Sequence, residues 1–237
     1  MVDIFDEVDE ELRADKAQAV LKQYGGLILA AAFAVVLGVA GWQGWQWWQA
    51  RQDQAAAIRF LAAMRIADNL SPMPGLAAPD DAATAARRGQ AMTGFAGVAA
   101  DGPAGYRALS RLREAGLKAD AGDLPAAVSI WNSIAGDGSV DPLLRDLANL
   151  LAVLRQLDTG DAAQLAARLK PMAEANSPWR ALAQEQLALL DIRMGQTEAA
   201  KETLGRLSRD TAAPIGVRNR AGAMLARLGG PAGAAGG

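Results

Sequence analysis

The sequence predicts an all-α protein, with a single N-terminal transmembrane helix followed by an array of repeated helical hairpins. The first observation is an uninterrupted stretch without any charged residue, from Gln23 to Ala50. The second is a recurrence of proline and glycine behind that stretch, with a period of about 36 residues. The third is composition: Ala, Leu, Arg, Glu and Gln dominate, and β-branched residues never alternate with polar ones over a strand's length.

The apolar stretch has the length of a membrane span. Residues 25–48 number 24, and at about 1.5 Å per residue they cover roughly 36 Å, enough for the hydrocarbon core with some tilt. Indole rings favour the level of the lipid headgroups, so tryptophans at the end of the stretch predict an interfacial anchor. These residues are Trp42, Trp45, Trp47 and Trp48. A signal peptide cleaved after Ala40 is the alternative, but a segment rich in acids precedes the stretch and no basic n-region opens it.

The orientation of the span depends on basic residues, of which three flank each side. They are Arg13, Lys16 and Lys22 before it, and Arg51, Arg59 and Arg65 after it. The first hydrophobic segment usually fixes topology, and Lys16 and Lys22 lie close to its edge. We therefore expect a bacterial inner-membrane protein with a cytosolic N-terminus and a large periplasmic domain from Arg51 onward.

One face of the span carries small side chains at intervals of four, four and three residues, namely Ala30, Ala34, Gly38 and Gly41. Such a face lets a partner transmembrane helix approach closely, although a face that merely meets lipid is also compatible with the pattern.

The cytosolic segment, residues 1–24, has an apolar helical stripe and a net charge of −4. The stripe comprises Ile4, Phe5, Val8 and Leu12. An acidic amphipathic helix is unsuited to anionic lipid, so a protein partner or a solvated lead-in to the span remain as interpretations.

Behind the span, residues 49–81 form a helix and a Pro-rich linker, residues 82–229 form the repeat domain, and residues 230–237 form a flexible tail. Prolines begin the helical units and glycines divide them into two helices. The prolines are Pro103, Pro142, Pro178 and Pro214, and the glycines are Gly122, Gly160 and Gly195. A period of about 34 to 36 residues with a central turn glycine is typical of tetratricopeptide-like arrays, so we predict a tetratricopeptide-like helical-hairpin solenoid with three hairpins.

Positions at fixed distances from the turn glycines favour small residues, because the two helices of a hairpin approach closely there. Seven residues before the glycines stand Ala115, Val153 and Ala188, and five after them stand Ala127, Leu165 and Ala200. The middle unit departs at both positions, so its helices are expected to pack differently. Residues 214–228 are predicted to form a single helix that caps the array.

Composition excludes most enzyme classes. The chain has no cysteine and no histidine, so thiolate catalysis, disulfides, the usual zinc sites and histidine-based mechanisms cannot occur. From Arg51 onward 21 basic residues face 19 acidic ones, which gives no basic groove for nucleic acid. We expect a non-enzymatic protein without catalytic residues, cofactor, metal or small-molecule substrate; an enzyme would require a cofactor or metal to be found bound.

One segment has the spacing of a calcium loop. Asp137, Ser139 and Asp141 alternate along the chain as the first ligands of such a loop do. Pro142, however, occupies the position of the loop's glycine, which favours a capped turn between repeats.

Other conspicuous side chains also have simple structural interpretations. The aromatic residues Trp131 and Trp179 are expected to fill the core, with an anchor on a concave surface as the alternative. The adjacent carboxylates Asp80 and Asp81 flank a loop, and solvated surface is the expectation for them.

Several segments resemble a known family of single-pass proteins. They are Phe5–Arg13, the Gly25-Gly26 entry and Gly41-Trp42 exit of the span, Gly105–Leu109, Asp141–Ala148 and Pro178–Ala183. Together they are similar to the single-pass tetratricopeptide-like proteins of proteobacteria, above all the alphaproteobacterial branch, a family that includes the YfgM-type ancillary subunit of the SecYEG translocon.

The resemblance implies an inner-membrane anchor and a periplasmic repeat domain that contacts the translocon and hands exported proteins to periplasmic chaperones. An organiser of envelope machinery, such as outer-membrane assembly or cell division, without client handling is the alternative function. Protein partners are expected in either case, and crosslinking in cells distinguishes the two.

Overall fold

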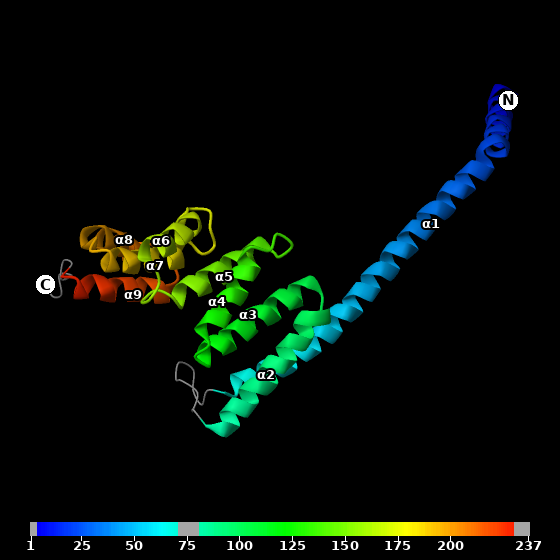
Figure 1. The fold of residues 1–237 in the computed structure, drawn as a ribbon. Coiled ribbons are helices and arrows are strands. Elements are labelled where there is room, and N and C mark those ends of the chain that lie inside the picture. Colours follow the sequence, from blue (N-terminus) through cyan, green and yellow to red (C-terminus); the bar gives the residue numbers. More distant parts are fainter. Residues whose placement is uncertain (1–3, 71–80, 230–237) are drawn as a thin grey trace. The chain divides into compact units, whose positions relative to one another are not determined.

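The structure of the protein is a computed structural model that describes residues 4–70 and 81–229. Every regular element in these ranges is helical (Figure 1). The predicted all-α class is therefore confirmed. The described part of the chain excludes the side chains of residues 1–25 and of Ile28, and all of residues 71–80 and 230–237. The expected apolar stripe of residues 1–24, the Pro-rich linker and the flexible tail therefore lie outside the described residues.

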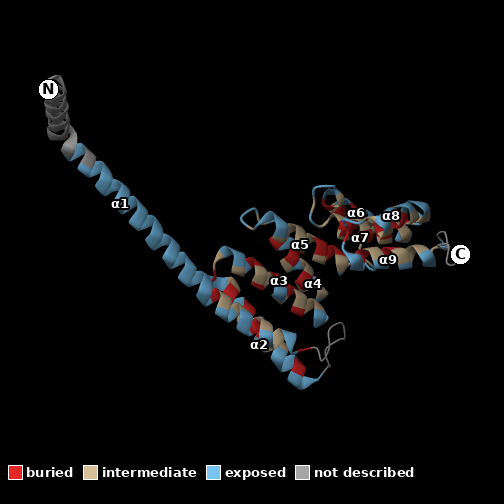
Figure 2. Cartoon of the chain, turned by 180° about the vertical axis from the view of Figure 1, so that it is seen from behind, coloured by how far each residue is buried: buried red, intermediate tan, exposed pale blue. Residues whose placement is uncertain are grey.

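The chain divides into two compact units, Met1–Gln54 and Ala55–Gly237. The first unit consists of the N-terminal part of helix α1 (Ile4–Asp68). Residues 29–50 of this helix are all exposed (Figure 2), and its segment from Leu29 onward is long and apolar enough to cross a membrane. A single N-terminal helix with the length and composition of a membrane span is thus confirmed.

The second unit begins with the last turns of α1, which pack on α2 (Ala82–Asp101). The two helices approach closely because Gly94 has no side chain: a Cβ built there would lie only 2.9 Å from the Cβ of Ala63. The rings of Phe60 and Phe95 pack in a tilted arrangement, with an interplanar angle of 59° and centroids 5.5 Å apart. At the end of α2, Asp101 accepts a hydrogen bond of 2.9 Å from Arg59. Residues 55–68 therefore pack with the helical array, whereas the sequence pattern predicts only a helix between the span and the Pro-rich linker.

Three hairpins and one further helix follow α2, and consecutive helices lie against each other. The hairpins are α3 (Ala104–Asp120) with α4 (Leu124–Ala135), α5 (Pro142–Leu154) with α6 (Ala162–Leu169), and α7 (Arg180–Arg193) with α8 (Thr197–Arg209). The last helix, α9 (Ile215–Arg227), packs on α8 and α7. The predicted hairpins and the C-terminal helix are confirmed.

Local signals set the helix starts. Aspartates at the N-caps accept hydrogen bonds from backbone N–H groups of the first turn, which have no partner inside the helix. They are Asp81 before α2, Asp123 before α4, Asp141 before α5 and Asp161 before α6. Pro142 is the first residue of α5, and Pro103 and Pro214 are the N-caps of α3 and α9.

The turn glycines differ in their geometry. Gly122 and Gly195 have φ values of 86° and 76°, in the region that favours glycine, and each closes a tight turn. Gly160 does not adopt a positive φ; a Cβ there would come within 3.0 Å of the Gln156 carbonyl oxygen. The middle turn is longer, and its second helix α6 has only eight residues before a 3₁₀ turn, Lys170–Ala173. The middle unit thus differs from the other two in its turn and in the length of its second helix.

The six positions at fixed distances from the turn glycines are all buried. Each hairpin contributes its pair to one core cluster: Ala115 and Ala127 to the first, Val153 and Leu165 to the second, and Ala188 and Ala200 to the third. The repeat period therefore predicts correctly which of these positions are buried in the core. This holds also for the middle hairpin, where larger side chains occupy both positions.

Polar side chains also connect successive units, at separations close to one repeat. Arg155, at the end of α5, reaches Asp120 at 2.7 Å, 35 residues earlier. Arg168 of α6 donates to Asn132 at 2.8 Å, 36 residues earlier. Arg220 of α9 reaches Glu185, again 35 residues earlier. Each arginine thus binds the preceding unit, in addition to the apolar contacts.

Candidate binding surfaces

The small residues of the span form an open face on α1. The four expected partner-packing residues, Ala30, Ala34, Gly38 and Gly41, are all exposed in the first unit. A Cβ added at Gly38 or Gly41 would meet nothing within 4 Å among the described atoms. The face is therefore accessible to another helix or to lipid.

The four tryptophans of the expected interfacial anchor are also exposed. Between 50% and 65% of each residue is accessible. The rings of Trp45 and Trp48 lie 5.6 Å apart, and the guanidinium of Arg51 lies 4.1 Å from the ring centroid of Trp47. A cation over an indole face next to exposed aromatic rings is an arrangement suited to a membrane surface.

An apolar groove of about 510 Å³ lies in the described part of the second unit. It is formed by the end of α1 and by α2, α3, α4 and α5. Its apolar lining consists of Ala67, Phe95, Leu109, Leu112, Gly116, Leu117, Trp131, Leu147 and Leu151. We call this surface the groove. Exposed concave apolar surface of this kind is typical of sites that receive another chain.

Charged residues border the groove. Arg155 and Asp120 form an ion pair across two units at its edge. Asp68 and Arg113 also line it, and neither has an ion-pair partner within the described residues. An apolar wall with charges of both signs at the edge suits an amphipathic protein segment rather than a small uniformly apolar ligand.

The two tryptophans of the repeat domain fill the core, as expected. Trp131 in α4 is 1% exposed and belongs to the core cluster of the first hairpin. Trp179 is partly buried and packs on the core cluster of the middle hairpin. It lies immediately before α7, at the N-cap.

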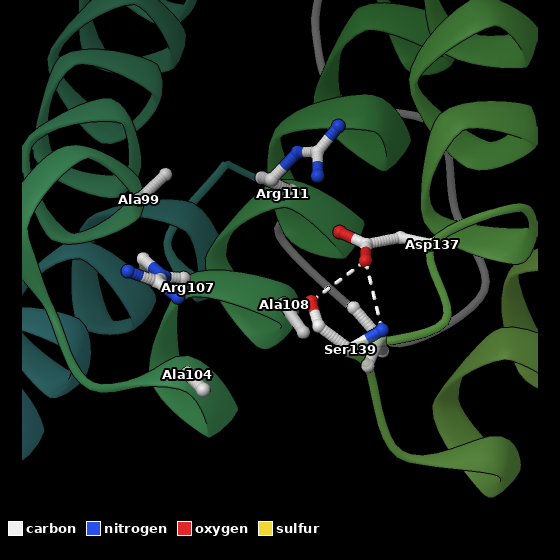
Figure 3. A pocket seen from close by; sticks show the side chains of 8 residues that line it. Ala99, Ala104, Arg107, Ala108, Arg111, Asp137 and Ser139 are labelled. Atoms are coloured by element: carbon white, nitrogen blue, oxygen red, sulfur yellow. Dashed lines mark hydrogen bonds between the residues drawn. The ribbon is translucent and has the colours of Figure 1, made fainter.

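A smaller and more polar pocket, of about 190 Å³, lies between α2, α3 and the turn that joins α4 to α5 (Figure 3). We call it the arginine pocket. Arg107 and Arg111 extend from α3, and Asp137 and Ser139 come from the turn; Asp137 lies on the side of Arg111, and Arg107 lies on the other side of the pocket. Arg111 donates to the Ser133 hydroxyl at 2.6 Å.

The turn beside this pocket is the segment with calcium-loop spacing. Asp137 accepts hydrogen bonds from the backbone N–H and the hydroxyl of Ser139, at 2.9 and 2.6 Å. Asp141 accepts from the N–H of Leu143 and so caps α5. The bonds from Ser139 hold the pKa of Asp137 below its usual value, and Arg111 and Arg107 act in the same direction. The segment is a capped turn between repeats, as favoured from the sequence.

Of the two carboxylates expected at the solvated loop surface, Asp80 lies outside the described residues. Asp81 is exposed and caps α2. This bond to the backbone of Thr84 lowers the pKa of Asp81. Asp81 therefore has a structural role at a helix start.

Stacked hairpins with an apolar groove define a helical-repeat protein of the kind that typically serves as a protein-interaction scaffold. The comparison with protein families agrees: residues 18–150 match the family described as tetratricopeptide repeat-like domain. Because this match covers more than half of the chain, the protein belongs to that family. Comparisons with curated proteins and with solved structures found no match.

Sequence reasoning did not identify the groove or the arginine pocket. One indication was available: Leu109 and Leu147 stand at the same distance before the turn glycines Gly122 and Gly160, and both line the groove. A search for apolar residues at equivalent positions outside the small-residue pairs would have found them. No comparable indication exists for the arginine pocket, because its residues come from three unrelated segments.

Proposed function

We propose that the protein is a membrane-anchored adaptor that binds other proteins through its repeat domain. In this proposal α1 spans the bacterial inner membrane with its N-terminus in the cytosol, and the second unit lies in the periplasm. The adaptor acts at a SecYEG-type translocon and aids the hand-over of exported proteins to periplasmic chaperones, as the YfgM-type resemblance implies.

The observation that carries the proposal is the groove. Its apolar lining comes from the end of α1, from α2, from the first hairpin (α3 and α4) and from α5. An extended or amphipathic segment several residues long can therefore lie across it. Exported chains on their way to the outer compartments expose such segments before they fold. Binding by a preformed helical surface requires no titrating residue.

The anchor supplies the location. Lys16 and Lys22 close to the span favour a cytosolic N-terminus. The face of Ala30, Ala34, Gly38 and Gly41 is the surface on which a translocon helix packs, since small residues permit close backbone approach. The exposed tryptophans and Arg51 hold the periplasmic end of α1 at the headgroup level.

Site-specific photocrosslinking in intact cells tests the proposal. A photoreactive residue replaces Leu109 in the groove, Leu37 in the span, or Gln164 on the exposed surface of α6 as a control. We expect exported proteins or chaperones to crosslink at Leu109 and translocon helices at Leu37, with neither at Gln164. Crosslinks at Leu109 that are no stronger than at Gln164 would contradict the client-binding role. Crosslinks only to outer-membrane assembly or division proteins would favour the structural organiser instead.

A further inference from the structure

The arginine pocket has an uncompensated positive charge. Its lining includes the guanidinium groups of Arg107 and Arg111 and a single carboxylate, that of Asp137. The side chain of Arg107 makes no ion pair or hydrogen bond within the described residues, and that of Arg111 donates only to the neutral hydroxyl of Ser133. The pocket therefore carries a net charge of +1.

The two arginines stand at i and i+4 on α3, where like charges face each other and destabilise a helix by a few tenths of a kcal/mol. The acidic neighbour Glu114, three residues after Arg111, lies within 3.9 Å of Lys118 instead. Asp137 is committed to the turn, because one of its oxygens accepts both donors of Ser139. The positive charges of Arg107 and Arg111 are thus available to bind an anionic ligand.

The size and wall of the pocket restrict that ligand. Ala99, Ala104 and Ala108 line it with methyl groups, which leave space and lower the local dielectric. The volume of about 190 Å³ is roughly that of six water molecules in the liquid. A single negative charge balances the net charge of the pocket, whereas a doubly charged phosphate would leave the occupied site with a net charge of −1.

We propose that the arginine pocket binds one carboxylate group, which accepts hydrogen bonds from the guanidinium groups of Arg107 and Arg111. The site is separate from the groove, because the two surfaces share no lining residue. The carboxylate comes either from a small free acid or from an acidic side chain of a protein, and the experiment distinguishes the two.

The test uses the full-length chain in mild detergent with ¹⁵N-labelled arginine, and follows the side-chain Nε–H resonances by NMR. Arg107→Lys and Arg111→Lys assign the two signals. The probes are sodium acetate, at ionic strength held constant with sodium chloride, and the peptide acetyl-Ala-Ala-Glu-Ala-Ala-amide, with its Gln counterpart as the uncharged control.

We expect saturable shifts of both signals with a carboxylate probe and none with the Gln peptide. Arg107→Ala should weaken binding roughly tenfold, and Asp137→Asn, which keeps the oxygen that Ser139 contacts, should tighten it about fivefold. Arg227→Ala, at an exposed position of α9 that lines neither the pocket nor the groove, is the control and should change nothing. Circular dichroism checks that each variant folds.

Equal affinity for acetate and the Glu peptide assigns the site to free carboxylates, and a tenfold preference for the peptide assigns it to a protein side chain. The proposal is overturned if neither probe gives a saturable shift, or if the Arg107→Ala and Asp137→Asn variants bind as the unaltered chain does.

Discussion

The contact between Arg220 and Glu185 offers the sharpest test of how the last helix, α9, stabilises the end of the array. Glu185 lies in α7 with only 1% of its side chain exposed, and both of its oxygens accept hydrogen bonds from Arg220, at 2.6 and 2.7 Å. The same contact raises the pKa of Arg220. Arg220→Ala would leave a buried carboxylate without its only charged partner in the described structure.

The magnitude follows from the unequal exposure of the two side chains. Removing one partner of a fully buried ion pair costs about 3–5 kcal/mol. The side chain of Arg220 is 52% exposed, so its removal also admits water to Glu185. We therefore expect a loss of about 2–3 kcal/mol, close to that of hydrogen bonds to a charged group. For a domain of this size, that lowers the midpoint of thermal unfolding by roughly 4–12 °C.

The assay is thermal unfolding of the full chain in mild detergent, followed by circular dichroism at the helix band. Arg227→Ala is the matched control, because Arg227 is exposed on the same helix and makes no ion pair within the described residues. It should change stability by less than about 0.5 kcal/mol.

A double variant separates charge burial from loss of packing. Glu185→Leu combined with Arg220→Leu removes both charges, and should unfold within about 1 kcal/mol of the unaltered chain. The reasoning is refuted if Arg220→Ala is as stable as Arg227→Ala, or if the double variant is less stable than Arg220→Ala alone.

Four further predictions concern other parts of the chain. Gly94→Val should cost about 1–3 kcal/mol in the same melt, because its side chain would collide with Ala63; Gly97→Val, which faces open space on the same helix, is the control, and equal losses would contradict the close approach. Burial raises the pKa of Asp191, against the opposing effect of Lys170, so its ionised form destabilises the fold above its raised pKa and stability increases as pH falls through it; Asp191→Asn should therefore melt at a higher temperature than the unaltered chain at pH 7 and lose this advantage in acid, and no gain at pH 7 would argue against it. If the proposed small-residue face packs on a partner helix, Gly38→Leu should reduce co-purification of that partner while membrane insertion is retained, whereas unchanged recovery would assign the face to lipid. For the proposed topology, protease added to spheroplasts should remove the chain beyond Arg51 and leave a protected fragment of about 50 residues; protection of the large domain would place it in the cytosol.

Much of the fold was predictable because its determinants are local. Pro142 at the first position of α5, Asp123 at an N-cap and Gly122 in a left-handed turn each act through the conformation of a few neighbouring residues. The repeat extends this local information, since a position that is small in one unit, such as Ala115, has a counterpart in the next, such as Val153.

The remaining features depend on contacts between distant segments. The packing of residues 55–68 on α2 requires Gly94 to meet Ala63 across the linker, and nothing near either residue indicates this. Arg220 occupies a polar position of α9, as expected for a capping helix, but its partner Glu185 is identifiable only after the helices are stacked. The arginine pocket combines residues of α2, α3 and the turn after α4, at positions that do not repeat.

The groove depends on the spacing between units, and this links the stability of the array to its proposed binding role. Its walls come from α1, α2, α3, α4 and α5. The buried alanine pair of the first hairpin packs α3 against α4, and Arg155 and Asp120 connect α5 to α3 at the groove edge. The middle hairpin has larger side chains at the equivalent positions and a shorter second helix. The groove is thus formed by the helices that precede the middle hairpin in sequence, together with α5, the first helix of that hairpin. Because Asp120 and Arg155 line the groove, a change at either alters the binding surface directly, although their exposed ion pair contributes little to stability. A change at Arg220 alters the stability of the last helices and leaves the groove lining intact.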